Sequence, residues 1–213
     1  VPVSISEIKV TRKIIESLGA KFTKFTNKEL IVQTKRIHDI SFSASLGLIN
    51  RIGVLTAGPL LLRSGEAKIP KPGGDQIGAR PINFHLDALI KLGATVKEHR
   101  DYFLLKAKRL VGTEITLPFP SVGATENIII TATLAIGKTT IHNAAIEPEI
   151  MDLIMLLQKM GAIIDVRTNR KIVITGVDKL RGAEHRVIPD RLEAASFACA
   201  AIASQGDIKI LDA

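Results

Sequence analysis

An internal repeat with a period of about 70 residues organises this 213-residue chain. The tripeptide Leu18-Gly19-Ala20 returns as Leu92-Gly93-Ala94 and again as Met160-Gly161-Ala162. Each copy follows an amphipathic segment and precedes a short apolar run of the kind that forms a strand. A glycine directly after the last apolar residue of a helix is typical of the C′ position, where the left-handed backbone favours a residue without Cβ. The pattern therefore predicts related helix–hairpin units.

Each unit is predicted to contain an outer amphipathic helix, a hairpin and an inner helix that is apolar on every side. The outer helices are expected at Ser6–Leu18, Asn83–Leu92 and Glu149–Met160, and the inner helices at Ser45–Arg63, Ala124–Ala135 and Arg191–Ser204. Hairpins are expected to pair Thr95–Glu98 with Phe103–Lys106, and Ile163–Arg167 with Lys171–Thr175. A second echo begins at Gly65, Gly137 and Gly206 and predicts a helix C-cap leading into a strand. The predicted fold class is α/β, with outer helices and strands enclosing buried central helices.

Both ends of the repeat pattern are incomplete. No inner helix precedes the outer helix at Ser6, so the first unit is expected to lack its opening half of roughly 40 residues. The last inner helix is followed by one predicted strand, Ile208–Leu211, and the chain begins at Val1 rather than Met. We therefore expect this chain to be a fragment.

Composition excludes several classes of protein. A single cysteine, Cys199, forms no internal disulfide, which favours a reducing cytoplasmic compartment and an inert core thiol. The apolar runs are shorter than the roughly 20 residues that a membrane helix needs, and no signal peptide is visible. The five histidines have no metal-ligand spacing, so neither a metal nor another cofactor is predicted.

The net charge of +8 favours an anionic partner. Nucleic acid is disfavoured because aromatic residues make up only 4% of the chain and the Lys and Arg residues are scattered. A phosphorylated small molecule fits this charge pattern better.

Five segments carry side chains suited to binding such a molecule. A glycine-rich loop, 72–81, holds Asp75 and Arg80 and could approach a ligand closely, although a plain solvent loop has the same composition. The segment 119–127 leads into an inner helix, where free N–H groups and Ser121 would bind an anion or Ser121 would simply cap the helix. The other three segments are Asn50-Arg51, the stretch 143–149 with Glu147, and Pro189-Asp190-Arg191. Because the inner helices begin near Arg51, Ser121 and Arg191, we predict that their N-termini converge on a phosphate-binding pocket.

Four motifs occur in this order in one known family. They are Gly73-Gly74-x-x-Ile77-Gly78-x-Arg80-Pro81, the string PSVGATEN at 120–127, Glu147-Pro148-Glu149-Ile150 and Pro189-Asp190-Arg191-x-Glu193. With these motifs the chain resembles, from Val1 to Ala213, the enolpyruvyl transferases that act on UDP-N-acetylglucosamine in peptidoglycan synthesis. The resemblance implies two domains, each an inside-out α/β barrel of repeated βαβαββ-type units. Residues 1–188 would form the first domain without its opening half-repeat, and residues 189–213 the first elements of the second.

The resemblance also implies a reaction and its residues. Enolpyruvyl would pass from phosphoenolpyruvate to the 3′-hydroxyl of UDP-N-acetylglucosamine with release of phosphate and without a metal. Asp75 matches the loop residue that protonates the substrate methylene. Most members have cysteine there, and the change to aspartate removes the thiol that fosfomycin alkylates, which predicts insensitivity to that drug. The implied substrate-binding residues are Arg51, Arg80, Pro81, Ile82, Asn83, Phe84, Phe119, Pro120, Ser121, Val122, Gly123, Glu147 and Arg191.

Departures from the family pattern limit this expectation. Phe119 stands where many members have a lysine. The family's Lys-Asn pair that binds phosphoenolpyruvate would lie before Val1, and its aspartate base would lie after Ala213. The chain alone is therefore expected to be inactive. Three alternatives remain open: a UDP-sugar-binding remnant, a sister transferase acting on shikimate 3-phosphate, and a basic nucleic-acid binder.

Overall fold

The sequence repeats form three helix–hairpin units in the computed structural model, which describes residues 3–73 and 82–211. The outer helices are α1 (Ser6–Ser17), α4 (Asn83–Lys91) and α6 (Pro148–Lys159). The antiparallel hairpins that follow them are β1 (Lys21–Phe25) with β2 (Leu30–Gln33), β4 (Thr95–Glu98) with β5 (Tyr102–Lys106), and β8 (Ile163–Arg167) with β9 (Lys171–Thr175). Gly19, Gly93 and Gly161 connect helix to hairpin at φ of +113°, +107° and +103°, which confirms the predicted left-handed C′ positions.

The inner helices α3 (Ala57–Ser64) and α5 (Val122–Ala132) each lead into a strand that joins the next hairpin. Strand β3 (Glu66–Pro70) completes a sheet of order β3-β5-β4. Strand β7 (Lys138–His142) lies between β9 and the short parallel strand β6 (Glu114–Thr116), giving the order β6-β7-β9-β8. The predicted turns at Gly65 and Gly137, which precede β3 and β7, are confirmed by their positive φ angles.

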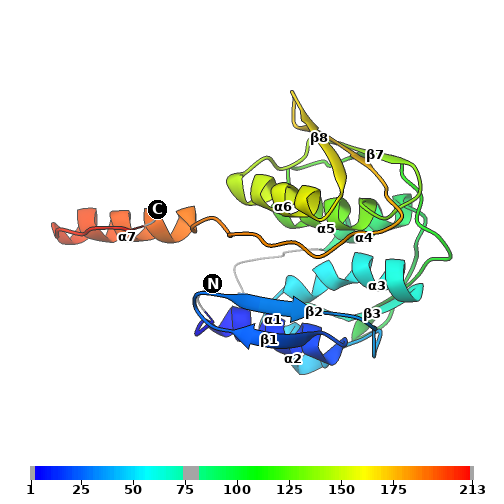
Figure 1. The fold of residues 1–213 in the computed structure, drawn as a ribbon, viewed down its shortest axis with the longest axis horizontal. Coiled ribbons are helices and arrows are strands. Elements are labelled where there is room, and N and C mark those ends of the chain that lie inside the picture. The colour runs from blue at the N-terminus through cyan, green and yellow to red at the C-terminus, as the bar shows by residue number, and fades with distance from the viewer. Residues whose placement is uncertain (1–2, 74–81, 212–213) are drawn as a thin grey trace. The chain divides into compact units, whose positions relative to one another are not determined.

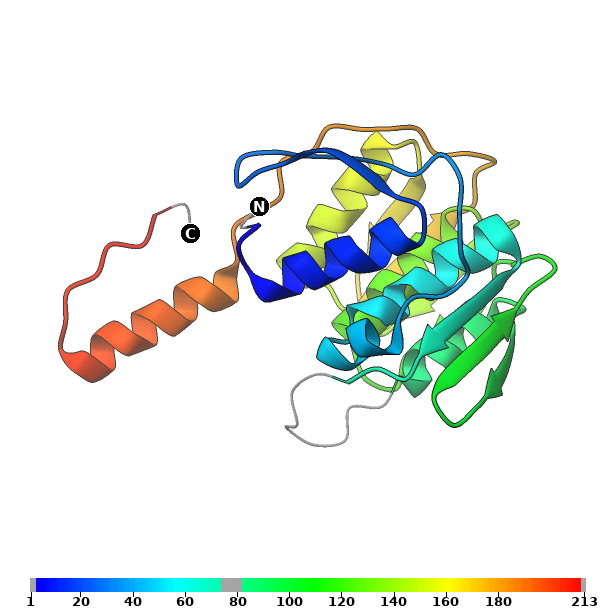
Figure 2. The ribbon, with the colours of Figure 1, turned by 90° about the horizontal axis from the view of Figure 1, so that it is seen from below.

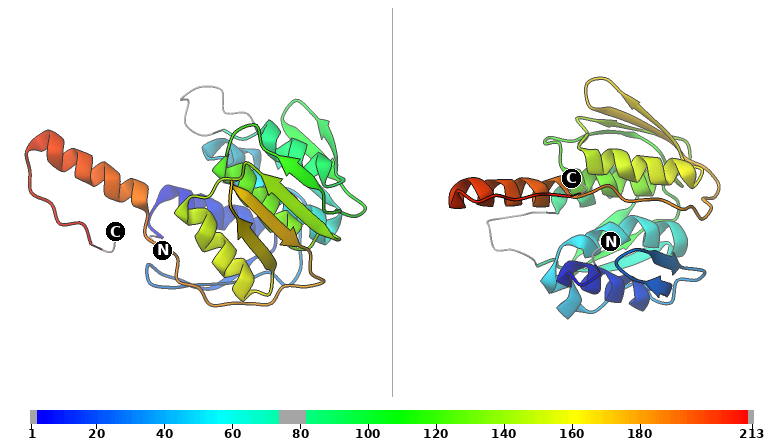
Figure 3. Two further views of the ribbon diagram at one scale, coloured as in Figure 1. Left: turned by 90° about the horizontal axis from the view of Figure 1, so that it is seen from above. Right: turned by 60° about the vertical axis from the view of Figure 1, so that its left-hand side comes forward.

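The core of this part of the chain lies where the inner helices meet the inward faces of the sheets. Ala57 of α3 and Ile129 of α5 are fully buried, as are Leu105 of β5 and Ile141 of β7. Figure 1 shows α4, α5 and α6 grouped with β7 and β8, and α1, α2 (Ala44–Ile49) and α3 grouped with β1 to β3. In Figure 3, α6 lies against the β8–β9 hairpin. Helices at the centre and sheets outside them confirm the predicted α/β class.

The inner helix predicted at Ser45–Arg63 is interrupted. The chain forms α2, then the 3-10 helix η1 (Ile52–Thr56), then α3. The break lies at Asn50, whose backbone is extended and whose Oδ1 accepts a hydrogen bond from the Ile52 N–H at 3.2 Å. An asparagine side chain that bonds its own backbone two residues on competes with the helical ladder, so one helix was the wrong prediction.

The chain divides into two compact units, Val1–Ala183 and Glu184–Ala213. In the second unit, helix α7 (Arg191–Ser204) has the predicted bounds, but none of its described residues is buried, and Cys199 is exposed. The predicted strand at Ile208–Leu211 is absent from the described residues, and the left-handed cap is Gln205 rather than Gly206. These predictions fail because the described part of this unit contains no second element against which a helix can bury its sides or a strand can pair.

None of the helices in the described part of the chain has the length and apolarity needed to cross a bilayer.

Candidate functional site

The N-terminus of α5 is the best-defined candidate for an anion site in the first unit. Ser121 is the N-cap, and its Oγ accepts a hydrogen bond from the Ala124 N–H at 3.3 Å. Its carbonyl accepts from both the N–H and the Oγ1 of Thr125, at 3.0 and 2.8 Å. Among the described residues, the N–H groups of Val122 and Gly123 have no hydrogen-bond partner. Unpaired N–H groups at the positive end of a helix dipole attract negative charge.

Two nitrogen-rich side chains from other elements lie beside this terminus. His85 of α4 contacts α5, because its Nδ1 lies 3.2 Å from the Nδ2 of Asn127. A Cβ added to Gly123 would lie 3.3 Å from the Cε1 of the same imidazole ring, so the ring edge faces the first turn of α5. The guanidinium of Arg51, the N-cap of η1, is close enough to disfavour a second positive charge on His85.

Burial, and secondarily Arg51, lower the pKa of His85 to about 4. The imidazole is therefore neutral near pH 7, whereas the guanidinium of Arg51 keeps its charge. One neutral imidazole and two free N–H groups thus lie at the start of α5, and the charge of Arg51 acts on that imidazole.

The acidic segment predicted from 143–149 is connected to the same helix. The Ala145 N–H donates to Thr125 Oγ1 at 3.0 Å, and the side chain of Asn143 donates to the Leu117 carbonyl at 2.9 Å. Glu147 is the N-cap residue of α6, where its carbonyl accepts from the Ile150 N–H at 2.9 Å. Its carboxylate does not cap the helix, and its buried Oε2 has no hydrogen-bond partner in the described part of the chain.

A second carboxylate, that of Glu126 in α5, differs in its pKa from an ordinary surface glutamate. Burial raises the pKa of Glu126, and the nearby charge of Glu149 raises it further. Glu149 lies in the first turn of α6, where a carboxylate favours the helix dipole, whereas the first turn of α5 holds no acidic residue.

The predicted site residues divide into three groups. Arg51, Asn83, Phe84 and the segment Phe119–Gly123 are at least partly exposed, Ile82 is buried, and Glu147 is half-buried. Asp75, Arg80 and Pro81 lie outside the described residues. Arg191 belongs to the second unit, where it is exposed at the start of α7 and follows the N-cap Asp190. Arg51 acts electrostatically on His85, whose ring lies near Gly123, and the convergence of the three N-termini on one phosphate-binding pocket stays a prediction.

Sequence reasoning missed His85 and Asn127. His85 belongs to none of the motifs, and Asn127 ends the string PSVGATEN without a predicted role of its own, because their relation depends on a contact between residues 42 positions apart. Within residues 3–73 and 82–211, no group of three or more metal-ligating side chains could hold a metal ion.

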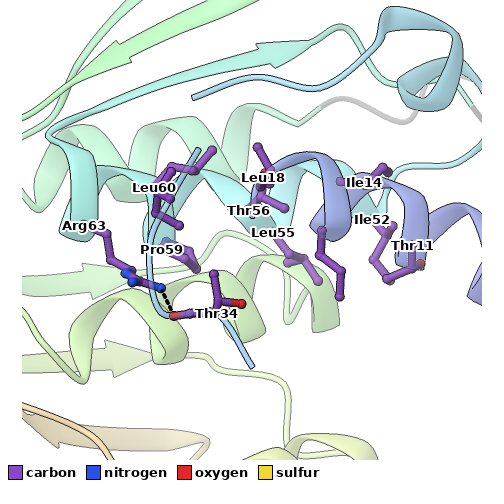
Figure 4. A pocket seen from close by; sticks show the side chains of 12 residues that line it. Thr11, Ile14, Leu18, Thr34, Ile52, Leu55, Thr56, Pro59, Leu60 and Arg63 are labelled. Carbon is purple, nitrogen blue, oxygen red and sulfur yellow. Dashed lines mark hydrogen bonds between the residues drawn. The ribbon is translucent and has the colours of Figure 1, made fainter. Parts of the chain in front are cut away.

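A separate cavity of about 300 Å³ lies between α1, the η1–α3 segment and residues 34–37. Figure 2 shows α1 beside η1 and α3, and Figure 4 shows the cavity between them. Its walls are mainly aliphatic, and the guanidinium of Arg63 donates to the carbonyls of Thr34 and Lys35 at 2.9 and 3.0 Å. None of the predicted site residues lines it. This cavity therefore does not have the polar lining that a phosphorylated ligand needs.

Comparison with known proteins identifies relatives along the whole chain. The model of the EPSP synthase (3-phosphoshikimate 1-carboxyvinyltransferase) family matches residues 2–213. Two proteins named UDP-N-acetylglucosamine 1-carboxyvinyltransferase, from Prochlorococcus marinus (strain NATL2A) and Vesicomyosocius okutanii, are 45% and 43% identical over 97% of this chain. These alignments cover 46% and 49% of the two relatives, so the chain spans about half the length of the curated relatives it matches.

Solved structures show the same fold at lower identity. The enolpyruvyl transferase NikO from Streptomyces tendae matches with a TM-score of 0.78 and 23% identity, over 92% of this chain and 47% of that protein. EPSP synthase from Acinetobacter baumannii matches with a TM-score of 0.70 and 19% identity, over 91% and 44%.

Proposed function

Because the chain belongs to the EPSP synthase family of enolpyruvyl transferases, we propose that it forms part of an enzyme acting on UDP-N-acetylglucosamine. In the proposed reaction, the 3′-hydroxyl of the sugar gives its proton to a base, its oxygen bonds to C2 of phosphoenolpyruvate, and C3 gains a proton from an acid. The resulting adduct then loses phosphate from C2 and a proton from C3, which leaves the enolpyruvyl ether. This reaction would take place in the cytoplasm, as a step of peptidoglycan synthesis.

The observation that carries this proposal is the group of donors at the start of α5. Both substrates are phosphate esters or diphosphates, so a binding site needs positive charge and N–H donors. Arg51 would supply the charge, the free N–H groups of Val122 and Gly123 would bind an anionic oxygen, and Ser121 would hold this turn in place. Phe119 is 62% exposed, and it would contribute contact area rather than the charge that a lysine would give.

Asp75 is the proposed proton donor to C3 of phosphoenolpyruvate. An aspartic acid donates a proton near neutral pH only if its pKa is raised, which requires a desolvated site. A carboxylate lacks the thiol that fosfomycin alkylates, so we propose that the enzyme is insensitive to this drug. The Asp75→Cys variant is expected to gain a covalent fosfomycin adduct at position 75, detected by peptide mass spectrometry. Cys199 of the same chain serves as the control thiol, and an adduct at Cys199 alone would contradict this role of position 75.

Binding of UDP-N-acetylglucosamine by the 213-residue chain is the direct test. Calorimetric titration is expected to give saturable binding that the Arg51→Ala variant weakens by at least tenfold. The matched control is Arg63→Ala, because Arg63 is an arginine of the same region that lies in the apolar cavity. Equal affinity of all three proteins, or no binding by the unmodified chain, would refute the proposed site.

The proposed domain organisation makes a second test possible. Residues 1–188 would form most of one domain and residues 189–213 would begin another, so the chain alone is expected to release no phosphate from the two substrates. Turnover by these 213 residues in a coupled phosphate assay would contradict this expectation.

Substrate choice separates the proposal from its nearest alternative. The family model is named for the shikimate enzyme, whereas the relatives at 43–45% identity are named for the UDP-sugar enzyme, and this favours the UDP-sugar. Tighter binding of shikimate 3-phosphate than of UDP-N-acetylglucosamine would reverse the assignment.

A further inference from the structure

The imidazole of His85 has two nitrogens in different surroundings. Its Nδ1 lies 3.2 Å from the Nδ2 of Asn127, and the same Nδ2 lies 3.3 Å from the backbone carbonyl oxygen of Val54. His85 is 8% exposed and Asn127 is 1% exposed, so water cannot readily replace either contact. The three residues come from α4, α5 and η1, and each contact joins a different pair of elements.

The carbonyl of Val54 decides which way the Asn127 amide is turned. A carbonyl oxygen only accepts hydrogen bonds, so the amide atom facing it must be the NH₂ group. The second hydrogen of that NH₂ points to His85 Nδ1, which must therefore carry a lone pair. A neutral imidazole with an unprotonated Nδ1 carries its hydrogen on Nε2.

The opposite tautomer is disfavoured by the same chain of contacts. With its hydrogen on Nδ1, His85 would place a donor against the donor NH₂ of Asn127. Turning the amide over would satisfy the ring but would set Asn127 Oδ1 against the Val54 oxygen, two acceptors without a proton between them. Only one arrangement of the three groups pairs a donor with an acceptor at both contacts.

We propose that Asn127 is a positioning residue that holds His85 as the Nε2–H tautomer, so that the ring presents a fixed N–H donor beside the N-terminus of α5. This inference rests on the proposed function, because the donor would serve the anionic part of the UDP-sugar. The ring edge that faces Gly123 includes Nε2, which would lie 3.5 Å from a Cβ at that position. Among the described residues, the hydrogen-bond contact of the His85 ring is that of Nδ1 with Asn127, so Nε2 remains available as a donor.

The tautomer matters for binding because it decides whether Nε2 presents a hydrogen-bond donor or an acceptor to a ligand. A protonated Nε2 donates to a phosphate or diphosphate oxygen, whereas an Nε2 lone pair repels it. Asn127 would thus control ligand affinity without touching the ligand.

Nitrogen NMR of the chain labelled with ¹⁵N-histidine tests the inference directly. The two ring nitrogens of a neutral histidine have widely separated ¹⁵N shifts, and the pattern of their couplings to the ring protons identifies which one carries hydrogen. The His85→Gln variant assigns the His85 signals by their loss. We expect the Nε2–H tautomer in the unmodified chain near pH 7, and the Nδ1–H tautomer there would overturn the inference without any variant.

The Asn127→Asp variant reverses the contact, because a carboxylate accepts a hydrogen from Nδ1. We expect the His85 proton to move to Nδ1, or both nitrogens to be protonated. If the proton moves from Nε2 to Nδ1, we expect the affinity for UDP-N-acetylglucosamine to fall by at least tenfold. The matched control is Thr133→Ala, a buried polar residue of the same helical region whose hydroxyl donates locally to the Ile130 carbonyl. That variant is expected to keep both the tautomer and the affinity, even where it lowers stability.

The outcomes separate the two proposals. An unmodified chain with the Nε2–H tautomer that fails to bind UDP-N-acetylglucosamine contradicts the proposed function. A chain that binds the UDP-sugar, and whose Asn127→Asp variant keeps the unmodified tautomer, contradicts the positioning role of Asn127. A moved proton with unchanged affinity contradicts the role of the His85 donor in binding.

Discussion

Replacing His85 by glutamine is expected to remove a large part of the acid sensitivity of the folded chain. His85 is 8% exposed, and its pKa falls from 6.5 to about 4, first because of burial and then because of Arg51. The unfolded chain therefore binds a proton at this residue between about pH 6.5 and pH 4, whereas the folded chain does not. Because the unfolded state binds more protons in this window, His85 makes stability decrease as the pH falls.

The size of the effect follows from these two pKa values. Between pH 7 and pH 5, linkage of a single group with a folded pKa of about 4 and an unfolded pKa of 6.5 lowers the free energy of unfolding by about 2 kcal/mol. Glu126 acts in the opposite direction, because its raised pKa gives stability that is present at low pH and lost as the pH rises. A comparison of two variants that both keep Glu126 cancels this contribution.

Urea unfolding at pH 7 and pH 5 measures the difference. The unmodified chain is expected to lose about 2 kcal/mol more than His85→Gln over this interval. His99→Gln is the matched control, because His99 is a half-buried histidine of the β4–β5 turn and stacks on Tyr102. If His85→Gln and the unmodified chain lose equal stability between these pH values, the imidazole is not held neutral by its surroundings and the reasoning fails.

Three further outcomes are expected from the packing. Ser121→Ala removes the N-cap bond to α5 and is expected to lower the free energy of unfolding by about 1 kcal/mol in urea, whereas Ser121→Gly costs a few tenths as much. Gly58→Ala would place a Cβ 1.8 Å from the Oγ1 of Thr131 and is expected to cost about 1–3 kcal/mol by the same assay, while Gly182→Ala, with no atom within 4 Å of its Cβ, serves as the neutral control. Leu105→Ala empties a fully buried position and is expected to cost about 2–5 kcal/mol, with equal urea midpoints for variant and parent as the contradicting result.

The parts of the fold that the sequence predicted are those set by local chemistry. Gly19, Gly93 and Gly161 marked the helix ends because only glycine adopts their positive φ cheaply, and each hairpin followed at its expected place. The break at Asn50 was missed because the sequence does not show that this asparagine, within an otherwise apolar run, accepts a hydrogen bond from the Ile52 N–H. Local rules thus located the elements but did not predict the interruption of the inner helix expected at Ser45–Arg63.

The candidate site was predictable only in part. Ser121 and Arg51 could be found because a serine before an apolar helix and an arginine before another are visible as patterns. His85 could not be found, because its low pKa arises from burial and from Arg51, a residue 34 positions away in the sequence. The pairing of His85 with Asn127 likewise depends on how α4 packs on α5.

Helix α7 shows the limit of composition as evidence for burial. The run of small apolar residues in Arg191–Ser204 predicts a helix without a polar face, and the helix forms, with the carboxylate of Asp190 accepting hydrogen bonds from the N–H groups of Leu192 and Glu193 at 2.8 and 3.3 Å. Its Phe197 is 54% exposed and its Ile202 is 80% exposed in the described structure. A helix is buried only when another element packs against it, and the sequence of the helix itself does not specify that element. The cap and the helical propensity determine where α7 begins and ends, whereas its covering depends on contacts that residues 184–211 do not supply among themselves.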